Sequence, residues 1–293
     1  MAVGDKRDTG DTGSKSSKAD KKSGDLTVTA LYTAQVWKWA KFDGGELFGT
    51  WRGRDVFNAT NLSLGIARVF RRGLPSLRHS LAQRHAMIDA VMAESGCAQV
   101  LELAAGLSRR GAATSANPDV SYVEVDLPAV VDKKQKLLKR SKRGREVADR
   151  DNLTFVRGNV FDLDLDELVV DGPACVISEG LMMYFDQDGQ KKLWTRINQL
   201  MKQHPGSVYV FDLVPFCEQP QPGVVGRTFE RLFKRFTKGA AFAFDDRTRE
   251  DLRDDLLACG FTEVDLLEPN TAPDHWPIPF TNRTTQTLVF RCR

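Results

Sequence analysis

The pattern of residues after Gly96 limits most strongly how this chain can fold. There, short runs rich in β-branched residues alternate with stretches of helical character. Such alternation is typical of a parallel sheet whose crossover helices cover its faces. Five runs predict strands: Gln99 to Leu103, Ser121 to Val125, Leu153 to Val156, Ala174 to Ser178, and Ser207 to Phe211. The sequence therefore predicts an α/β fold with a doubly wound sheet.

The last part of the chain departs from this alternation. A helix is expected near Arg247 to Ala258, followed by strands at Phe261 to Leu267 and at Thr287 to Arg291. No helical crossover fits between these two strands, because proline breaks helices and the segment contains Pro269, Pro273, Pro277 and Pro279. We expect the two strands to be antiparallel neighbours, which brings the sheet to seven strands.

The chain divides into three regions by composition. Residues 1–25 are mostly Gly, Ser, Thr, Lys and Asp, and we expect a disordered tail. Residues 26–96 are helical and rich in aromatic residues, and they predict a helical cap that includes a helix from Leu77 to Glu94. Residues 97–293 form the sheet domain, with a phenylalanine-rich insertion at about 214–244. The aromatic residues of the cap and the insertion fit either core packing or the lining of a substrate pocket.

Composition excludes several classes of protein. Lys and Arg number 42 against 39 Asp and Glu, a net charge of +3, so general nucleic-acid binding is not expected. No apolar stretch approaches the ~18 residues of a membrane span, and the N-terminus has no apolar signal region. The five cysteines form no Cys-x-x-Cys pair and the four histidines show no metal-ligand spacing. We expect a cytoplasmic protein with reduced thiols and without a metal or membrane.

Polar and glycine-bearing segments follow the predicted strands, at the edge where open α/β sheets bind ligands. Gly106 follows the first strand, and Asp126 ends the second, at the spacing of ~20 residues where an acid reads ribose hydroxyls. Asp126 also fits a surface acid or a helix cap. Asn159 follows the third strand, where it fits an adenine contact or a plain turn. Glu179 follows the fourth, and a carboxylate at the end of a central strand is costly unless it binds a cationic ligand or forms a salt bridge to an arginine.

Three segments together resemble a known family. The resemblance covers roughly residues 26–293 and rests on Leu101-Glu102-Leu103-Ala104-Ala105-Gly106, on Glu124-Val125-Asp126-Leu127-Pro128 followed by Lys133, and on Ser178-Glu179-Gly180-Leu181-Met182-Met183-Tyr184. These segments resemble the leucine carboxyl methyltransferase family, which includes bacterial O-methyltransferases associated with polyketide biosynthesis. The resemblance implies a Rossmann-like class I methyltransferase that binds S-adenosyl-L-methionine.

The resemblance also implies roles for individual residues. Gly106 would lie beside the methionine moiety, and Asp126 would hold the ribose. Asn159 and Val160 would contact adenine. Glu179 would line the cofactor site. Arg84, in the helix before the first strand, would pair with the cofactor carboxylate, because its fork matches a carboxylate; without the resemblance Arg84 would be taken as an exposed helix residue.

The first turn departs from the family pattern Gly-x-Gly-x-Asp-Thr-Arg, because this chain has Ala104 and Ser108 at the first and fifth positions. We expect an O-methyltransferase that acts on a small-molecule hydroxyl or a carboxylate. The alternatives are an NAD-dependent oxidoreductase and a non-catalytic protein that binds S-adenosylmethionine. The sequence identifies no general base, although Tyr184, Asp212 and His275 have suitable positions. The basic run from Lys133 to Arg145 fits a solvated helix face or a surface for an acidic partner.

Overall fold

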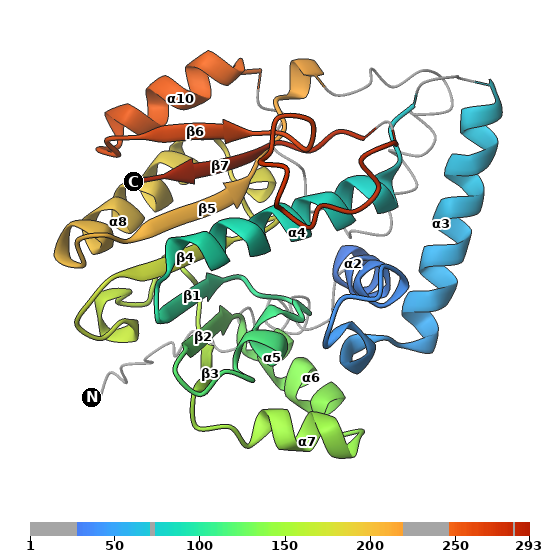
Figure 1. The fold of residues 1–293 in the computed structure, drawn as a ribbon, viewed down its shortest axis with the longest axis horizontal. Coiled ribbons are helices and arrows are strands. Elements are labelled where there is room, and N and C mark those ends of the chain that lie inside the picture. Colours follow the sequence, from blue (N-terminus) through green and yellow to red (C-terminus); the bar gives the residue numbers. More distant parts are fainter. Residues whose placement is uncertain (1–27, 71–73, 219–245, 284) are drawn as a thin grey trace, which may run out of the picture.

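The computed structural model describes residues 28–70, 74–218, 246–283 and 285–293 (Figure 1). These residues form a seven-stranded sheet in the order β3-β2-β1-β4-β5-β7-β6. The strands are β1 (Gln99–Leu103), β2 (Ser121–Asp126), β3 (Leu153–Arg157), β4 (Ala174–Ser178), β5 (Val208–Asp212), β6 (Val264–Leu267) and β7 (Val289–Cys292). The first five strands pair in parallel, whereas β7 is antiparallel to both β5 and β6. The predicted seven-stranded sheet and its antiparallel C-terminal pair are confirmed.

Three strands start later than predicted, and β2, β3, β5 and β7 each end one residue later than predicted. β5 starts at Val208 because Ser207 closes a turn, its hydroxyl donating to the His204 carbonyl. β6 starts only at Val264: the N–H groups of the two preceding residues both bond to the Arg293 carbonyl, which interrupts the ladder. β7 starts at Val289, because the Thr287 hydroxyl donates to the Ser80 carbonyl instead. In each case a hydrogen bond made outside the strand ladder delays the start of the strand relative to the apolar pattern.

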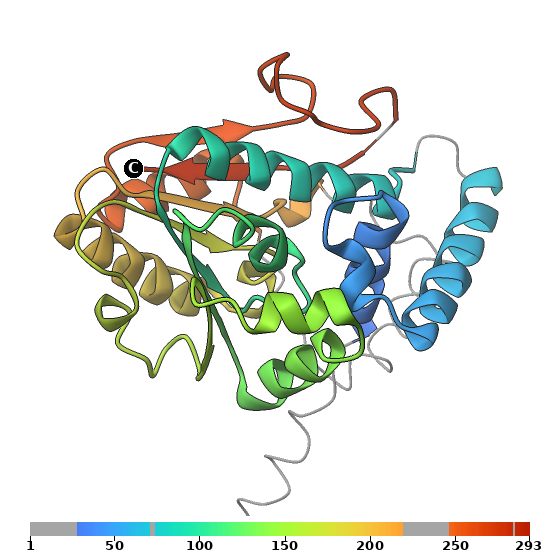
Figure 2. The same ribbon diagram turned by 60° about the horizontal axis from the view of Figure 1, so that its bottom comes forward.

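Helices cover both faces of the sheet (Figures 1 and 2). On one face lie α4 (Leu77–Ser95), α5 (Arg110–Thr114), α6 (Pro128–Leu138) and α7 (Lys142–Ala148), and on the other lie α8 (Gln187–Gln203) and α10 (Arg249–Ala258). Side chains alternate between the two faces along each strand. Thus Val176 of β4 packs in the cluster with α8 and α10, whereas its neighbours Cys175 and Ile177 pack in the cluster with α4. This doubly wound arrangement confirms the predicted fold class.

Two further helices lie beyond the carboxyl ends of the parallel strands (Figure 1). These are α2 (Val28–Trp39) and α3 (Trp51–Phe70), joined through the 3-10 helix η1 (Gly45–Phe48). An aromatic cluster around Trp37 and Phe57 packs α2 and α3 against the first part of α4. Among the helices that the structure describes, none has the length and apolarity needed to cross a membrane. The predicted tail at 1–25 and most of the predicted insertion at 214–244 lie outside the described residues.

Three short 3-10 helices complete the described elements: η2 (Asp166–Leu168), η3 (Met182–Tyr184) and η4 (Phe216–Glu218). The second of these follows β4 directly and keeps the segment after Glu179 close to the carboxyl edge of the sheet. The positions that the sequence assigns to ligand binding therefore gather at one edge, between the strand ends and the helices α2 and α4. The domain boundaries at residues 25 and 96 stay a prediction.

Candidate functional site

The turn after β1 is held in place by the acid that ends β2. The Gly106 N–H donates to Asp126 Oδ2 at 2.6 Å, and the Leu127 N–H donates to Oδ1 at 2.7 Å. Gly106 has φ +53°, a left-handed conformation that favours glycine. Among the residues that the structure describes, its chain neighbours aside, a Cβ at Gly106 would have only the Ala104 carbonyl oxygen within 4 Å, at 3.9 Å. The side of the turn that lacks a side chain is therefore open to a ligand.

The pKa of Asp126 reflects its surroundings. Burial raises the pKa above its ordinary value, and the two backbone N–H groups oppose that rise. The sequence left open whether Asp126 is a surface acid, a cap or a ribose ligand. In the structure its carboxylate joins the ends of β1 and β2, so it is not a simple surface acid.

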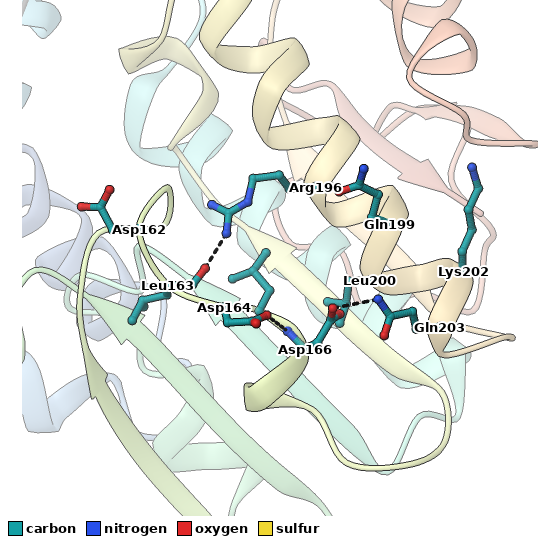
Figure 3. A pocket seen from close by; sticks show the side chains of 10 residues that line it. Asp162, Leu163, Asp164, Asp166, Arg196, Gln199, Leu200, Lys202 and Gln203 are labelled. Atoms are coloured by element: carbon teal, nitrogen blue, oxygen red, sulfur yellow. Dashed lines mark hydrogen bonds between the residues drawn. The ribbon is translucent and has the colours of Figure 1, made fainter.

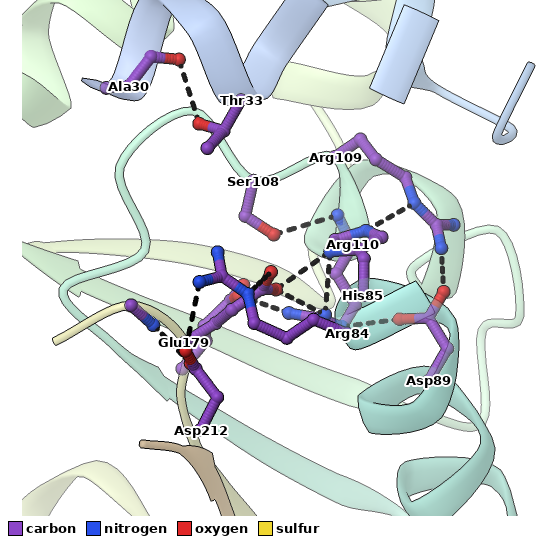
Figure 4. Close-up of polar contacts among 12 residues, drawn as sticks. Ala30, Thr33, Arg84, His85, Asp89, Ser108, Arg109, Arg110, Glu179 and Asp212 are labelled. Atoms are coloured by element: carbon purple, nitrogen blue, oxygen red, sulfur yellow. Dashed lines mark hydrogen bonds and ion pairs between the residues drawn. The ribbon is translucent and has the colours of Figure 1, made fainter. Parts of the chain in front are cut away.

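Glu179 lies in a buried network of ion pairs (Figure 4). Its Oε1 accepts from Arg84 Nε at 3.0 Å, and its Oε2 accepts from His85 Nδ1 and Arg110 Nη2, both at 2.8 Å. Burial by itself raises the pKa of Glu179, but His85, Arg84 and Arg110 lower it well below its usual range. The carboxylate is therefore ionised, and the salt bridge that the sequence required as one alternative is present.

Arg84 joins Glu179 to the end of β5. Its Nη1 donates to Asp212 Oδ2 at 2.9 Å, and Asp212 Oδ1 accepts from the Gly180 N–H at 2.6 Å. The side chain of Arg84 is only 12% exposed, so its interpretation as an exposed helix residue is wrong. Within the described residues no group accepts a hydrogen bond from Arg84 Nη2, and a Cβ on Gly180 would lie 3.4 Å from this nitrogen. One edge of the guanidinium therefore faces the position that Gly180 leaves open.

The network continues below Glu179 through two adjacent arginines. Arg110 is fully buried and bonds to Asp89 at 2.6 Å and to Glu102 at 2.5 Å, while Arg109 pairs with Asp89 and donates to His85 Nε2 at 2.9 Å. With Arg84 the network holds three guanidinium groups, and its carboxylates are those of Asp89, Glu102, Glu179 and Asp212. In their ionised forms these groups carry one net negative charge, which suits a cationic ligand.

The sequence interpretation missed His85, Asp89, Arg109 and Arg110. A signal was present: Arg84, His85 and Asp89 lie on the part of α4 that is otherwise occupied by buried apolar residues. Charged residues at helical spacing with such neighbours need partners inside the protein. Sequence reasoning could not find those partners, because they lie far along the chain, after β1 and at the ends of β4 and β5.

The segment after β3 brings two more candidate residues to the same edge. The Gly158 N–H donates to the Asp126 carbonyl at 2.9 Å, which ties this segment to the end of β2. Asn159 is exposed and its Oδ1 accepts from the Phe161 N–H at 3.0 Å, as in a turn. Val160 is buried, and its carbonyl accepts from Arg196 Nη1 at 2.6 Å. Asn159 therefore makes the turn contact that was one alternative, and its side chain is exposed at the carboxyl edge.

The three positions considered for a general base have different surroundings. Both carboxylate oxygens of Asp212 are engaged, by Arg84 and by the Gly180 N–H. His275 is exposed and bonds to Glu94, ten residues or about 15 Å along α4 from Arg84. Tyr184 ends η3, directly after β4. Only Asp212 and Tyr184 therefore lie at the edge that carries Glu179.

The two departures from the family pattern have structural consequences. Ala104 has φ +52°, a conformation that costs a non-glycine residue free energy. Ser108 Oγ accepts a hydrogen bond of 3.2 Å from the Arg110 N–H. The serine thereby helps to start α5 and holds Arg110 at the centre of the network.

A cavity of about 550 Å³ lies elsewhere, between α8 and the segment after β3 (Figure 3). Several of its polar groups bond to one another: Arg196 donates to the Leu163 carbonyl, and Gln203 Nε2 donates to Asp166 Oδ2 at 2.8 Å. None of the candidate site residues is among the residues that line this cavity, so it is separate from the site at the carboxyl edge.

The doubly wound sheet with its antiparallel end, the glycine turn after β1 and the acids after β2 and β4 together define a class of protein, the S-adenosylmethionine-dependent methyltransferases. Residues 52–198 match the family model described as leucine carboxyl methyltransferase. The chain belongs to this family.

Several solved structures are similar to this chain. A Bordetella parapertussis protein, described as a "possilbe exported protein", matches with 18% identity and a TM-score of 0.51 over 96% of this chain and 99% of its own. An O-methyltransferase family protein from Burkholderia thailandensis has 14% identity and a TM-score of 0.48, with 91% and 71% covered. The Synechocystis magnesium protoporphyrin IX methyltransferase with bound S-adenosylhomocysteine (SAH) has 14% identity and a TM-score of 0.44, with 82% and 96% covered.

The chain spans 56%, 50% and 60% of the length of three further structures that it resembles. No curated protein matches its sequence. These likenesses concern the fold, and the reaction is argued from the site below.

Proposed function

We propose that this protein transfers a methyl group from S-adenosyl-L-methionine to a small-molecule hydroxyl or a carboxylate. The observation that carries the proposal is a pair of left-handed glycines at the carboxyl edge, Gly106 after β1 and Gly180 after β4. Among the described residues outside its chain neighbours, only one atom lies within 4 Å of a Cβ placed on Gly106, and a Cβ on Gly180 would lie 3.4 Å from Arg84 Nη2. The backbone of the first turn is therefore accessible, and the second glycine lies beside an arginine that pairs with a buried carboxylate.

The side chains beside these two glycines suit the amino-acid end of the cofactor. Arg84 Nη2 would bond to the cofactor carboxylate, because a guanidinium nitrogen donates well to carboxylate oxygen. Glu179 would face the cationic groups, and the net negative charge of the network favours them. Gly106 would let the cofactor approach the backbone of the turn. The donor set and the charge of the site therefore fit the group.

The remaining candidates suit the nucleoside end. A carboxylate offers about four acceptor positions, and Asp126 uses one on each oxygen for a backbone N–H. The remaining positions can accept from the two ribose hydroxyls. Asn159 would meet the adenine amino group while Val160 supplies apolar surface. These roles agree with the hydrogen bond from the Gly158 N–H to the Asp126 carbonyl, which holds the segment after β3 beside Asp126.

The cofactor, when bound, supplies a methyl group on a sulfonium that is transferred in an in-line displacement. The protein then needs to align the acceptor and exclude water, and no covalent nucleophile is required. A carboxylate acceptor is already ionised, whereas a hydroxyl needs a general base. Asp212 pairs with Arg84, so we assign it to positioning this arginine and assign no base.

Two measurements test the proposed function. Calorimetry with SAH and with NAD separates a methyltransferase from an oxidoreductase, and we expect binding of SAH alone. Incubation of the full chain with methyl-labelled cofactor and a cell extract separates an enzyme from a silent binder, and we expect transfer of label to a small molecule. Binding of NAD without SAH would refute the proposal.

A further inference from the structure

His85 connects the N-terminal helices to the carboxylate of Glu179. Its imidazole is fully buried and stacks on the Trp37 ring, with the ring centroids 3.9 Å apart and an interplanar angle of 22°. The Phe42 ring lies at 5.3 Å, just after α2. The imidazole therefore sits between aromatic rings of the α2 segment on one side and the ion-pair network on the other.

The neighbours of His85 define its protonation. Arg109 Nε carries a hydrogen and lies 2.9 Å from His85 Nε2, so Nε2 must accept. Nδ1 then carries the hydrogen of the neutral ring and donates it to Glu179 Oε2 at 2.8 Å. Arg110 Nη2, 3.0 Å from Nδ1, is a second donor to the same oxygen. Burial lowers the pKa of His85 well below its usual value, which keeps the ring neutral.

Arg109, which fixes this tautomer, is itself held from three sides. It pairs with Asp89 of α4, lies 5.1 Å above the Phe42 ring, and has Nη1 3.4 Å from the Asp43 carbonyl. The family pattern has a threonine at this position of the turn. Arg109 and His85 therefore form a connection that runs from the segment after α2 to Glu179.

We propose that His85 is a positioning residue for cofactor binding: its Nδ1–H fixes the orientation of Glu179 Oε2, and Trp37 and Arg109 fix His85. The proposal rests on the proposed function, because it assumes that Glu179 contacts the cofactor. It adds that the docking of α2 on the sheet domain determines the affinity for the cofactor. Arg110 and Arg84 neutralise Glu179, but Arg110 also bonds to Asp89 and Glu102, and Arg84 also bonds to Asp212. The Nδ1–H of His85 donates to Glu179 alone.

Two substitutions separate the nitrogens of His85. In His85→Asn the side-chain amide can replace the Nδ1–H that donates to Glu179, whereas in His85→Gln the longer side chain places its amide near Nε2, towards Arg109. Both variants lose the stacked ring, so their stabilities should fall together. We expect the Kd for SAH to rise at least about tenfold in the Gln variant and clearly less in the Asn variant, which loses the ring but keeps a donor to Glu179, measured by calorimetry.

A second pair tests the connection to α2. Trp37→Leu removes the ring under His85, whereas Trp51→Leu removes a tryptophan that is 74% exposed on α3. We expect weaker SAH binding only in the Trp37 variant, at a temperature where circular dichroism shows that both are folded. Spectra of the wild-type protein labelled with ¹⁵N-histidine should show His85 with the hydrogen on Nδ1.

The outcomes are distinguishable. Equal affinities of the Asn and Gln variants, or a hydrogen on Nε2, would overturn the positioning role while leaving the proposed function intact. Failure of the wild-type protein to bind SAH would overturn the proposed function, and the role of His85 with it.

Discussion

Asp126 and Gly106 are twenty residues apart in the chain, yet the Gly106 N–H lies 2.6 Å from Asp126 Oδ2. The acid at the end of β2 therefore fixes the turn after β1, besides being available to a ligand. Any change to Asp126 alters two things at once, the shape of the turn and the acceptors offered to the ribose.

Asp126→Asn should weaken cofactor binding through both effects. The amide keeps the shape of the carboxylate but loses its charge and replaces one acceptor with a donor. We expect the Kd for SAH to rise at least about tenfold, roughly 1.4 kcal/mol. The matched control is Asp132→Asn on α6, where the acid is exposed and pairs with Arg157. Equal effects of the two substitutions, measured by calorimetry, would show that Asp126 has no special part in binding.

Gly106→Ala should block the cofactor, and Gly96→Ala supplies its control. Both glycines have left-handed backbones, with φ +53° and +64°, and neither would bring a Cβ into a clash. Each substitution should therefore cost about 1 kcal/mol of stability from backbone strain alone. Only the methyl group at Gly106 would lie in the open position beside the turn. We expect SAH affinity to fall more than about tenfold in that variant alone; similar affinities would place the ligand elsewhere.

The sheet was predictable because a short local run of apolar and β-branched residues is enough to indicate a buried strand. β1 and β4 were predicted to the residue, since Gln99 to Leu103 and Ala174 to Ser178 are short, mostly apolar runs bounded by turns. The strand ends pointed to Gly106, Asp126, Asn159 and Glu179 for the same reason. Local patterns fail where a partner comes from elsewhere in the chain.

The ion-pair network shows where that limit lies. Arg110 bonds to groups on α4, β1 and the segment after β4, and the sequence does not reveal which of these carboxylates it will meet. The ion pair of Arg84 with Asp212 was equally unpredictable, because Asp212 follows Arg84 by 128 residues. Only the sheet order, which brings β1, β4 and β5 together, makes these pairs possible.

Ala104→Gly should stabilise the protein. Ala104 has φ +52°, where an L-residue pays about 1–2 kcal/mol that glycine does not, while the added glycine costs roughly 0.5–1 kcal/mol in unfolded-state entropy. We expect a net gain of about 0.5–1 kcal/mol in urea unfolding. Ala105→Gly is the control: Ala105 is buried and has no left-handed backbone, so the substitution should destabilise. A loss of stability in both variants would show that the turn is not strained.

Glu124 should make the stability of the protein depend on pH. It is buried on β2 and forms an ion pair with Lys134, whose Nζ lies 2.5 Å from its Oε2. Burial raises its pKa from 4.5 to about 7, with Lys134 opposing and Glu102 adding to the rise. The folded protein therefore keeps a proton that the unfolded chain has lost between these pH values.

The sign of the effect follows from that proton. A carboxyl group whose pKa is raised on folding stabilises fully below its unfolded pKa, and this contribution is lost as the pH rises towards about 7. Glu124→Gln cannot titrate, so the free energy of unfolding of the wild type minus that of the variant should fall from pH 5 to pH 8. The steepest slope for one proton is about 1.4 kcal/mol per pH unit. Urea unfolding of both proteins across this range measures the difference, in which the titrations that they share cancel. A difference that does not change with pH would mean that Glu124 is already ionised beside Lys134 at pH 5.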